Sequence, residues 1–383
     1  MTFSCDGARE IFAASTDFTV GLEEEFAILD PATLDLVPGY EQLWAAAQDD
    51  ELLRASVAGE LISSEIEIRS GRGEDLAEAL ALQREVRGRL FALAARHGMP
   101  LASTGTHPWA DYREQPNIDT EHYRLVVEGL QYVARRNNTF SLHVHVGVRD
   151  ADRAVRVCDR LRSVLPQLLA VSASSPFLDA RNSGLHSARS LSFTRTFPRC
   201  GIPDAFGSWA AYRQYIELLL STGSIIEYTQ VWWSVRPHLH FGTVEVRICD
   251  AQVTAAESDA LASLITACVA QATRDEDEGR PMPGHPRRLL EENLWRAIRY
   301  GQEGRMIDLT TLREQPTPAA IQALMQWTEP VRAELGISDL RLPERNGAQR
   351  QRAGLDAGDT MQEVFARTVD ETQQTYAQEA PAA

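Results

Sequence analysis

The stretch that decides the fold lies near the start of the chain, where residues 20–26 read Val-Gly-Leu-Glu-Glu-Glu-Phe. It falls within a predicted strand over residues 19–29, which ends at an Asp-Pro turn. Residues two apart in a strand share a face, so Glu23 and Glu25 point the same way, roughly 7 Å apart, and Glu24 points the other way. An exposed edge strand with solvated charges would show the same pattern, so this stretch alone leaves both interpretations open.

Two further predicted strands repeat the pattern of paired ionisable residues. Glu65 and Glu67 share one face of a strand whose other face carries isoleucines, which is also typical of a sheet with one face in water. His143 and His145 share one face of a strand whose other face carries valines. Because histidine is the commonest transition-metal ligand, a pair in this position favours a site over a structural role.

The fourth predicted strand carries Glu245 and Arg247 on one face. They form either an intrastrand ion pair, worth about 0–1 kcal/mol if exposed, or a metal-binding carboxylate beside a phosphate-binding guanidinium. If the four faces coincide, the carboxylates repel one another and their pKa values rise unless cations neutralise them. Glutamate oxygens suit Mg²⁺ or Mn²⁺, and such ions beside an arginine indicate chemistry on a polyphosphate such as ATP.

The remaining elements follow no regular repeat. Predicted strands lie at residues 19–29, 61–68, 140–148 and 243–248, and predicted helices at residues 74–96, 257–272, 288–300 and 318–335. A charged segment rich in Pro and Gly over residues 275–287 predicts an exposed loop. This order favours an α+β fold with a mostly antiparallel sheet over a βαβ repeat. The chain has no GxGxxG and no GxxxxGK[ST] motif, so neither a Rossmann nor a P-loop site is predicted.

Composition narrows the class of protein. The 383 residues include 38 Lys+Arg and 54 Asp+Glu, a net charge of −16, which argues against a nucleic-acid or anionic-membrane binder. Five cysteines without a CxxC pair, no long apolar run and no signal-peptide pattern predict a cytoplasmic protein with reduced thiols. We expect one catalytic domain over residues 1–353, then a C-terminal helix and frayed tail over residues 354–383.

Six stretches of this chain resemble the second type of bacterial glutamate–cysteine ligase, a group also described as carboxylate-amine ligases within the glutamine synthetase and γ-glutamylcysteine synthetase superfamily. They are residues 20–26, 105–108, 142–148, 198–203, 232–250 and 292–296. The resemblance implies a six-stranded antiparallel sheet curved into a funnel with helices packed outside, as in the catalytic domain of glutamine synthetase. It also implies ATP, two or three Mg²⁺ or Mn²⁺ ions, and amide formation through an acyl phosphate, with glutamate the expected carboxylate substrate and an amine as its partner.

The resemblance also assigns roles to residues of this sequence. The positions that match the family's metal ligands are Glu23, Glu25, Glu67, His143 and Glu245. Arg247 resembles the arginine directed at the transferred phosphoryl group, and His145 would contact phosphate or substrate. Further residues are weaker candidates for substrate or nucleotide contacts, because ion pairs explain most of them as well. They are Glu65, Arg189, Arg199, Arg236, Asn293, Arg296 and Arg299. Glu60 falls near these residues, but strand parity does not place it in the site.

Some positions depart from the family pattern. Ser234 stands where an acid is expected, and His238 and His240 make the stretch before the fourth strand richer in imidazole. These departures bear on which amine or carboxylate the protein accepts. Trp232 and Trp233 are interpreted as core residues rather than as a platform for adenine.

Two alternatives to the ligase stay open on the sequence. One is a Zn²⁺ or Mn²⁺ hydrolase that uses His143 and His145 and turns over without ATP. The other is a degenerate ligase that only binds nucleotide or an amino acid. The excess of glutamate over histidine argues against the first, and the complete set of candidate ligands against the second. His107 either lines the site or caps a turn, the expected partners are small molecules, and a homodimer is expected only as the commonest oligomer.

Overall fold

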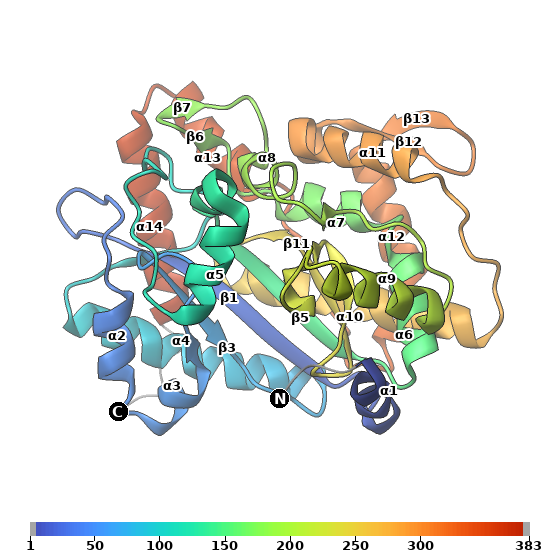
Figure 1. Ribbon diagram of the computed structural model, residues 1–383. Helices are drawn as coiled ribbons and strands as arrows, with labels where there is room; N and C mark the ends of the chain where they lie inside the picture. The colour runs from blue at the N-terminus through green and yellow to red at the C-terminus, as the bar shows by residue number, and fades with distance from the viewer. Residues whose placement is uncertain (1–4, 378–383) are drawn as a thin grey trace.

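The computed structural model describes residues 5–377, and an antiparallel sheet of seven strands lies at its centre (Figure 1). The strands follow the order β10-β11-β5-β1-β3-β2, and β4 pairs with the carboxyl end of β1. Their bounds are β1 Val20–Ile28, β2 Val57–Ala58, β3 Glu65–Arg69, β4 Leu101–Ala102, β5 Ser141–Gly147, β10 Val235–His238 and β11 Thr243–Asp250. The sheet has one strand more than the six expected, because β4 covers the part of β1 that β5 leaves unpaired.

Short strand pairs and helices surround this sheet. The outlying strands are β6 Phe177–Leu178, β7 Arg181–Asn182, β8 Cys200–Gly201, β9 Trp232–Trp233, β12 Arg305–Asp308 and β13 Arg313–Pro316. The α-helices are α1 Cys5–Ala14, α2 Tyr40–Ala47, α3 Glu51–Ser56, α4 Leu76–Arg96, α5 Glu121–Leu130, α6 Ala151–Leu161, α7 Leu165–Ser172, α8 Ala188–Ser192, α9 Trp209–Ser221, α10 Ala255–Asp277, α11 Arg287–Tyr300, α12 Thr317–Arg332, α13 Gly347–Asp356 and α14 Met361–Ala377. The 3₁₀ helices are η1 Gln131–Arg136, η2 Tyr228–Gln230 and η3 Gly301–Glu303.

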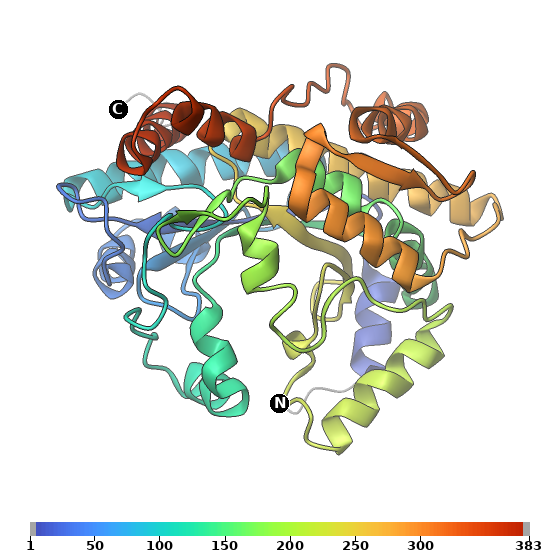
Figure 2. The ribbon, with the colours of Figure 1, turned by 90° about the horizontal axis from the view of Figure 1, so that it is seen from above.

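Helices cover one face of the sheet and flank the other. Figure 2 shows α4, α10 and α14 along one face, whereas α5 and α9 stand on either side of the opposite face. The strands turn their apolar residues toward the covered face, where Leu22, Phe26, Val144 and Val146 are at most 1% exposed. The period-2 alternation of the sequence thus separates an apolar face, buried by helices, from a polar face between α5 and α9.

Helix α10 extends past its predicted end at residue 272 and reaches Asp277. A capping box of Thr254 and Glu257 fixes its first turn. Its last turn is held by α6, because Arg156 and Arg160 bind Glu276 at 2.6 and 2.8 Å. The exposed loop predicted over residues 275–287 therefore begins only after these ion pairs.

The carboxyl-terminal helix α14 packs into the same core as the sheet. The Tyr376 ring stacks on Phe91 of α4 at 5.4 Å between ring centres and meets Phe26 of β1 edge-on at 5.3 Å. The expected boundary between residues 353 and 354 falls within α13, and the expected fraying of residues 380–383 lies outside the described residues. Among residues 5–377, none of the helices combines the length and apolar character that crossing a bilayer requires.

Candidate metal and active site

The register of three central strands brings the paired residues of the sequence together. Strand β1 pairs with β3 so that Glu25 lies opposite Glu67, and with β5 so that Glu23 lies opposite His143. Directly opposed residues of an antiparallel pair project from the same face. The polar residues of β1, β3 and β5 therefore gather on the face that the helices leave uncovered.

Strands β11 and β10 add to the same face from the other side. Glu245 of β11 lies opposite His145 of β5, and Arg236 of β10 lies opposite Glu245. Glu245, Arg236 and Arg247 line a cavity of about 350 Å³. The same cavity is lined by the remaining glutamates of the cluster, Glu23, Glu25, Glu60, Glu65 and Glu67.

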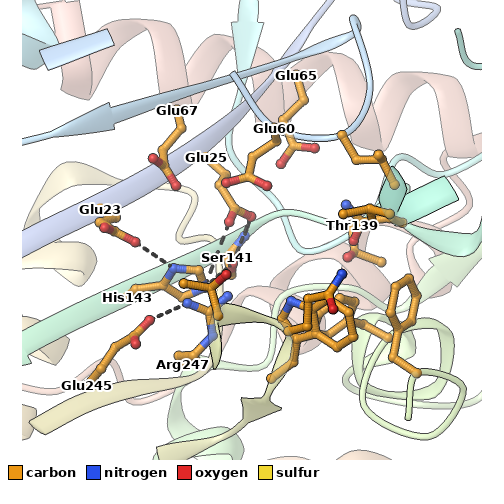
Figure 3. Close-up of a pocket in the computed structure, with 18 of the residues that line it drawn as sticks. Glu23, Glu25, Glu60, Glu65, Glu67, Thr139, Ser141, His143, Glu245 and Arg247 are labelled. Carbon is orange, nitrogen blue, oxygen red and sulfur yellow. Dashed lines mark hydrogen bonds and ion pairs between the residues drawn. The ribbon is translucent and has the colours of Figure 1, made fainter. Parts of the chain in front are cut away.

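Two groups of three residues in this cavity have the geometry of cation sites (Figure 3). The first consists of Glu23, His143 and Glu245, and the second of Glu25, Glu67 and His143. Within each group, one ligand atom from every residue lies within 4.8 Å of the others. His143 belongs to both groups, so the two candidate positions are adjacent.

Ser141, which sequence analysis missed, orients the second group. Its hydroxyl lies 2.8 Å from Nε2 of His143 and donates to Oε2 of Glu25 at 2.7 Å. Its backbone N–H donates to the same Oε2 at 2.5 Å. Ser141 stands two residues before His143 in β5, so strand parity could have placed it on the site face.

Repulsion among the carboxylates contributes to raised pKa values of the glutamates in β3 and in the loop before it. Burial and the charge of Glu25 raise the pKa of Glu65 well above its ordinary value, and burial and the charge of Glu23 do the same for Glu67. Removal from water and Glu25 raise the pKa of Glu60 to about 7. A cation among these oxygens would relieve this repulsion.

In the first group the positively charged and imidazole neighbours lower the pKa values of the two glutamates instead of raising them. Burial raises the pKa of Glu23, but His145 and His143 outweigh that effect and hold it well below its ordinary value. Burial also raises the pKa of Glu245, but the guanidinium groups of Arg236 and Arg247 outweigh that effect. The pKa of Glu245 lies well below its ordinary value, so this carboxylate stays ionised. Burial and then Arg247 lower the pKa of His143, which leaves a neutral ring with a lone pair for a cation.

The donor set fits Mg²⁺ or Mn²⁺. Oxygen ligands dominate, with one imidazole shared between the groups, as these hard cations prefer. Two buried atoms aimed at the cluster, Nε2 of His145 and Oε2 of Glu65, have no hydrogen-bond partner among the described residues. His145 Nε2 lies 3.4 Å from Oε1 of Glu23. A cation or substrate bound beside these two atoms would give each of them a partner.

Three arginines give one end of the cavity a positive lining. Arg236 donates from Nε to Oε2 of Glu245 at 2.5 Å, and Arg247 donates to Oε1 of the same carboxylate. Arg189 of α8 is anchored by the backbone carbonyl of Ile248 at 3.2 Å. Nε of Arg247 and Nε of Arg189 are buried without hydrogen-bond partners among the described residues, which leaves them available to an anion.

Four of the weaker sequence candidates lie outside this cavity. Arg199 lies against an indole ring, and its Nε donates to a backbone carbonyl. Asn293 pairs with both backbone groups of Ile307, which ties α11 to β12. Arg296 binds two glutamates on the surface, and Arg299 donates to a backbone carbonyl. The structure brings only Glu65, Arg189 and Arg236 of the weaker set to the site.

The structure also places Trp232, Trp233 and His107. It contradicts the interpretation of Trp232 as a core residue and decides between the two roles left open for His107. Trp232 lines the cavity instead of lying in the core, whereas Trp233 is buried as expected. His107 caps a turn, because its Nδ1 accepts from the N–H groups of Trp109 and Ala110 at 3.3 and 3.1 Å. It does not line the cavity.

A second cavity of about 460 Å³ adjoins the first and is mainly apolar. Both cavities are lined by Glu23, Arg69, His240 and Phe241, and His145 lines the second alone. The second also reaches α1, through Ile11 and Ala14. A flat apolar group in this cavity would lie next to the first group of candidate ligands.

Comparison with known proteins identifies the family. A family model described as glutamate–cysteine ligase family 2 matches residues 19–371. A protein of Sorangium cellulosum (strain So ce56) is 41% identical over 312 residues, which cover 82% of this chain and 83% of the relative. A protein of Solibacter usitatus (strain Ellin6076) is 37% identical over 362 residues, 93% of each chain. Both relatives bear the name "Putative glutamate–cysteine ligase 2".

Two solved structures share the fold. The glutamate–cysteine ligase of Francisella tularensis, in complex with AMP, has a TM-score of 0.69 at 11% identity and covers 94% of this chain and 90% of that one. A bifunctional glutathione synthetase of Pasteurella multocida has a TM-score of 0.65 at 12% identity and covers 98% of this chain and 54% of that one. At such identities the likeness concerns the fold alone. The family model and the curated relatives cover most of the sequence, so this protein is a ligase and belongs to glutamate–cysteine ligase family 2.

Proposed function

We propose that this ligase uses ATP to activate a substrate carboxylate as an acyl phosphate and then joins the acyl group to an amine. The observation that carries the proposal is the pair of ligand groups around His143, beside Arg247, in one cavity. The substrate carboxylate attacks the γ-phosphorus and ADP leaves. The amine then attacks the acyl carbon, inorganic phosphate leaves, and the amine loses a proton as the amide forms.

Each side chain has a role in this scheme. Glu23, His143 and Glu245 would hold one divalent cation, and Glu25 and Glu67 with His143 a second. When bound, these cations supply charge neutralisation for the phosphates. The resemblance implies two or three ions, and Glu60 or Glu65 would serve a third.

The arginines and His145 act on the anionic groups. Arg247 would stabilise charge on the transferred phosphoryl group, and the support for this role is that its Nε is buried and unpartnered among the described residues. Arg189 and Arg236 line the same end and would orient a phosphate or carboxylate. His145 would contact phosphate or substrate through Nε2, because its Nδ1 is engaged 3.0 Å from the Thr243 hydroxyl.

The two cavities divide the substrates. The apolar cavity suits the adenine ring of ATP, which is flat and poorly solvated, and it touches the first ligand group through Glu23. The acidic cavity, with Trp232 and Tyr123 on its walls, suits the amino-acid carboxylate and the amine. We propose glutamate as the carboxylate substrate, as the family name suggests, and leave cysteine as the first amine to test.

Several wider features stay predictions. They are the funnel shape of the sheet, the single catalytic domain over residues 1–353 with an appended segment over residues 354–383, a cytoplasmic location, and a homodimer. A metal-dependent hydrolase is the less favoured alternative, because glutamates outnumber histidines in both ligand groups.

Trapping of the acyl phosphate tests the function. With ATP, Mg²⁺, glutamate and hydroxylamine, we expect the unchanged protein to form a hydroxamate, and Glu245→Ala and Arg247→Ala to form none. Arg296→Ala, which removes a surface ion pair outside the cavity, is the matched control and should keep full yield. Undiminished hydroxamate from both cavity variants would contradict the proposal. ADP release across a panel of carboxylates and amines would then identify the substrates, and turnover without ATP would favour the hydrolase.

A further inference from the structure

A charged network lies on the helix-covered side of β1, directly behind the candidate metal site. Glu24 stands between Glu23 and Glu25 in the chain, but its side chain points to the opposite face and the residue is 3% exposed. Its neighbours on that face, Leu22 and Phe26, are apolar, as a helix-covered layer requires. A carboxylate buried among them needs an explanation, because taking a charge out of water is costly.

Donors from three helices hold both oxygens of Glu24. Arg87 of α4, which is fully buried, donates from Nε to Oε2 at 2.6 Å and from Nη2 to Oε1 at 2.9 Å. Gln83 of α4 donates to Oε2 at 2.7 Å. Ser258 of α10 donates to Oε1, and the Tyr376 hydroxyl of α14 lies 3.5 Å from the same atom.

The other end of Arg87 is fixed as well. Its Nη1 donates to Oδ1 of Asp259 in α10 at 2.8 Å. The guanidinium carbon lies 5.2 Å from the centre of the Tyr376 ring. Helices α4, α10 and α14 are thereby joined to a single point on β1, at Glu24.

Stability alone does not account for such a network. The attraction within a buried ion pair often only offsets the loss of hydration, and apolar residues of similar volume can serve as well. A bidentate arginine–carboxylate pair adds what apolar packing lacks, which is a fixed direction and distance. Since Glu23 and Glu25 flank Glu24 on the same short backbone, whatever fixes Glu24 also fixes the points from which they project.

We propose that Glu24 and Arg87 are positioning residues that hold β1 so that Glu23 and Glu25 meet His143 at metal-binding distance. Carboxylates on the site face repel one another, and the network anchors β1 against that repulsion from the other side. The proposal rests on the metal site of the proposed function. It adds to that function a role for two residues that touch neither metal nor substrate.

The test compares Mn²⁺ affinity with the thermal stability of the metal-free protein. Arg87→Met leaves Glu24 buried without its guanidinium, so Tm falls. The double variant Glu24→Met/Arg87→Met removes both charges, and most of the Tm returns. We expect its Kd for Mn²⁺, measured by isothermal titration calorimetry, to stay weaker by about tenfold or more. A double variant with the Tm and the Kd of the unchanged protein would overturn the proposal.

Two milder variants decide the question if the double variant does not fold. Gln83→Met and Ser258→Ala each remove one donor to Glu24, and each should weaken Mn²⁺ binding by about threefold with little change in Tm. An unaltered Kd in both would overturn the positioning role. The matched control is Arg160→Met, because Arg160 is 6% exposed and binds Glu276 far along α10. It should lower Tm and leave the Kd unchanged.

The same titration distinguishes failure of the positioning role from failure of the proposed metal site. If the unchanged protein binds Mn²⁺ and the double variant binds it equally well, only the positioning role is overturned. Failure of the unchanged protein to bind Mn²⁺ would overturn the metal site, and the inference with it.

Discussion

Nδ1 of His143 lies 3.1 Å from Oε2 of Glu23, although the two residues stand 120 positions apart in the chain. The other ring nitrogen, Nε2, lies 3.8 Å from Oε1 of Glu25. One imidazole therefore faces both groups of carboxylates, and it is the one side chain that the two groups share.

Replacement of this imidazole should weaken both candidate cation positions. We expect His143→Ala to raise the Kd for Mn²⁺ by about tenfold to a hundredfold, since it removes a ligand common to both groups. Electron paramagnetic resonance of free Mn²⁺ measures this directly. The control is His122→Ala at the rim of the cavity, where the half-exposed ring lies 3.7 Å from Glu227. Equal affinities for the two variants would show that His143 is not a ligand.

The pairing of Arg236 with Glu245 should matter to stability. Arg236→Met leaves a fully buried carboxylate with fewer donors, so we expect the free energy of unfolding to drop by about 3 kcal/mol. Urea unfolding of the metal-free protein gives the value. Arg296→Met breaks an ion pair on the surface and should cost about 0–1 kcal/mol. A cost for Arg236→Met no greater than that of the control would contradict the geometry described.

Acid should destabilise the fold through His107. Burial lowers the pKa of His107 to about 4, from an ordinary value near 6.5. The unfolded chain thus binds more protons between these two pH values, so stability is full above about pH 6.5 and falls toward pH 4. His107→Gln should reduce this dependence by about 3 kcal/mol over that range. Urea midpoints of both proteins at pH 4.5 and 7 measure the difference, and parallel pH profiles would refute the prediction.

Filling the apolar cavity should affect the nucleotide alone. Ala14→Trp places an indole at the α1 side of this cavity, so we expect the KM for ATP to rise by about tenfold while the Kd for Mn²⁺ is unchanged. Ala13→Trp is the matched control, because the adjacent residue is exposed and does not line the cavity. A KM that responds equally to both variants would argue against adenine in this cavity.

Local pattern sufficed for the elements that carry the site. The alternation of glutamate or histidine with aliphatic residues predicted β1, β3, β5 and β11 and the shared faces of their polar residues, because side-chain parity is a property of each strand alone. The pattern also placed Glu24 on the opposite face from Glu23. It gave no reason to expect Arg87 as its partner, since the two residues lie on different elements.

The pattern left other residues unplaced for the same reason. Arg296 and Arg189 were weaker candidates of equal standing, and only the packing of α11 against β12 and of α8 beside β11 separates them. Glu60 lies in a loop without strand parity, so its place beside Glu67 depends on how that loop meets β3.

The sequence by itself determined that β1, β3, β5 and β11 form and which of their residues share a side, because these follow from backbone geometry within a few residues. Tertiary structure alone decided that the four sides coincide. That outcome depends on the register between strands more than a hundred residues apart, such as Glu23 opposite His143. Register is set by the burial of one whole face and the hydrogen bonds of whole ladders, which no single segment specifies.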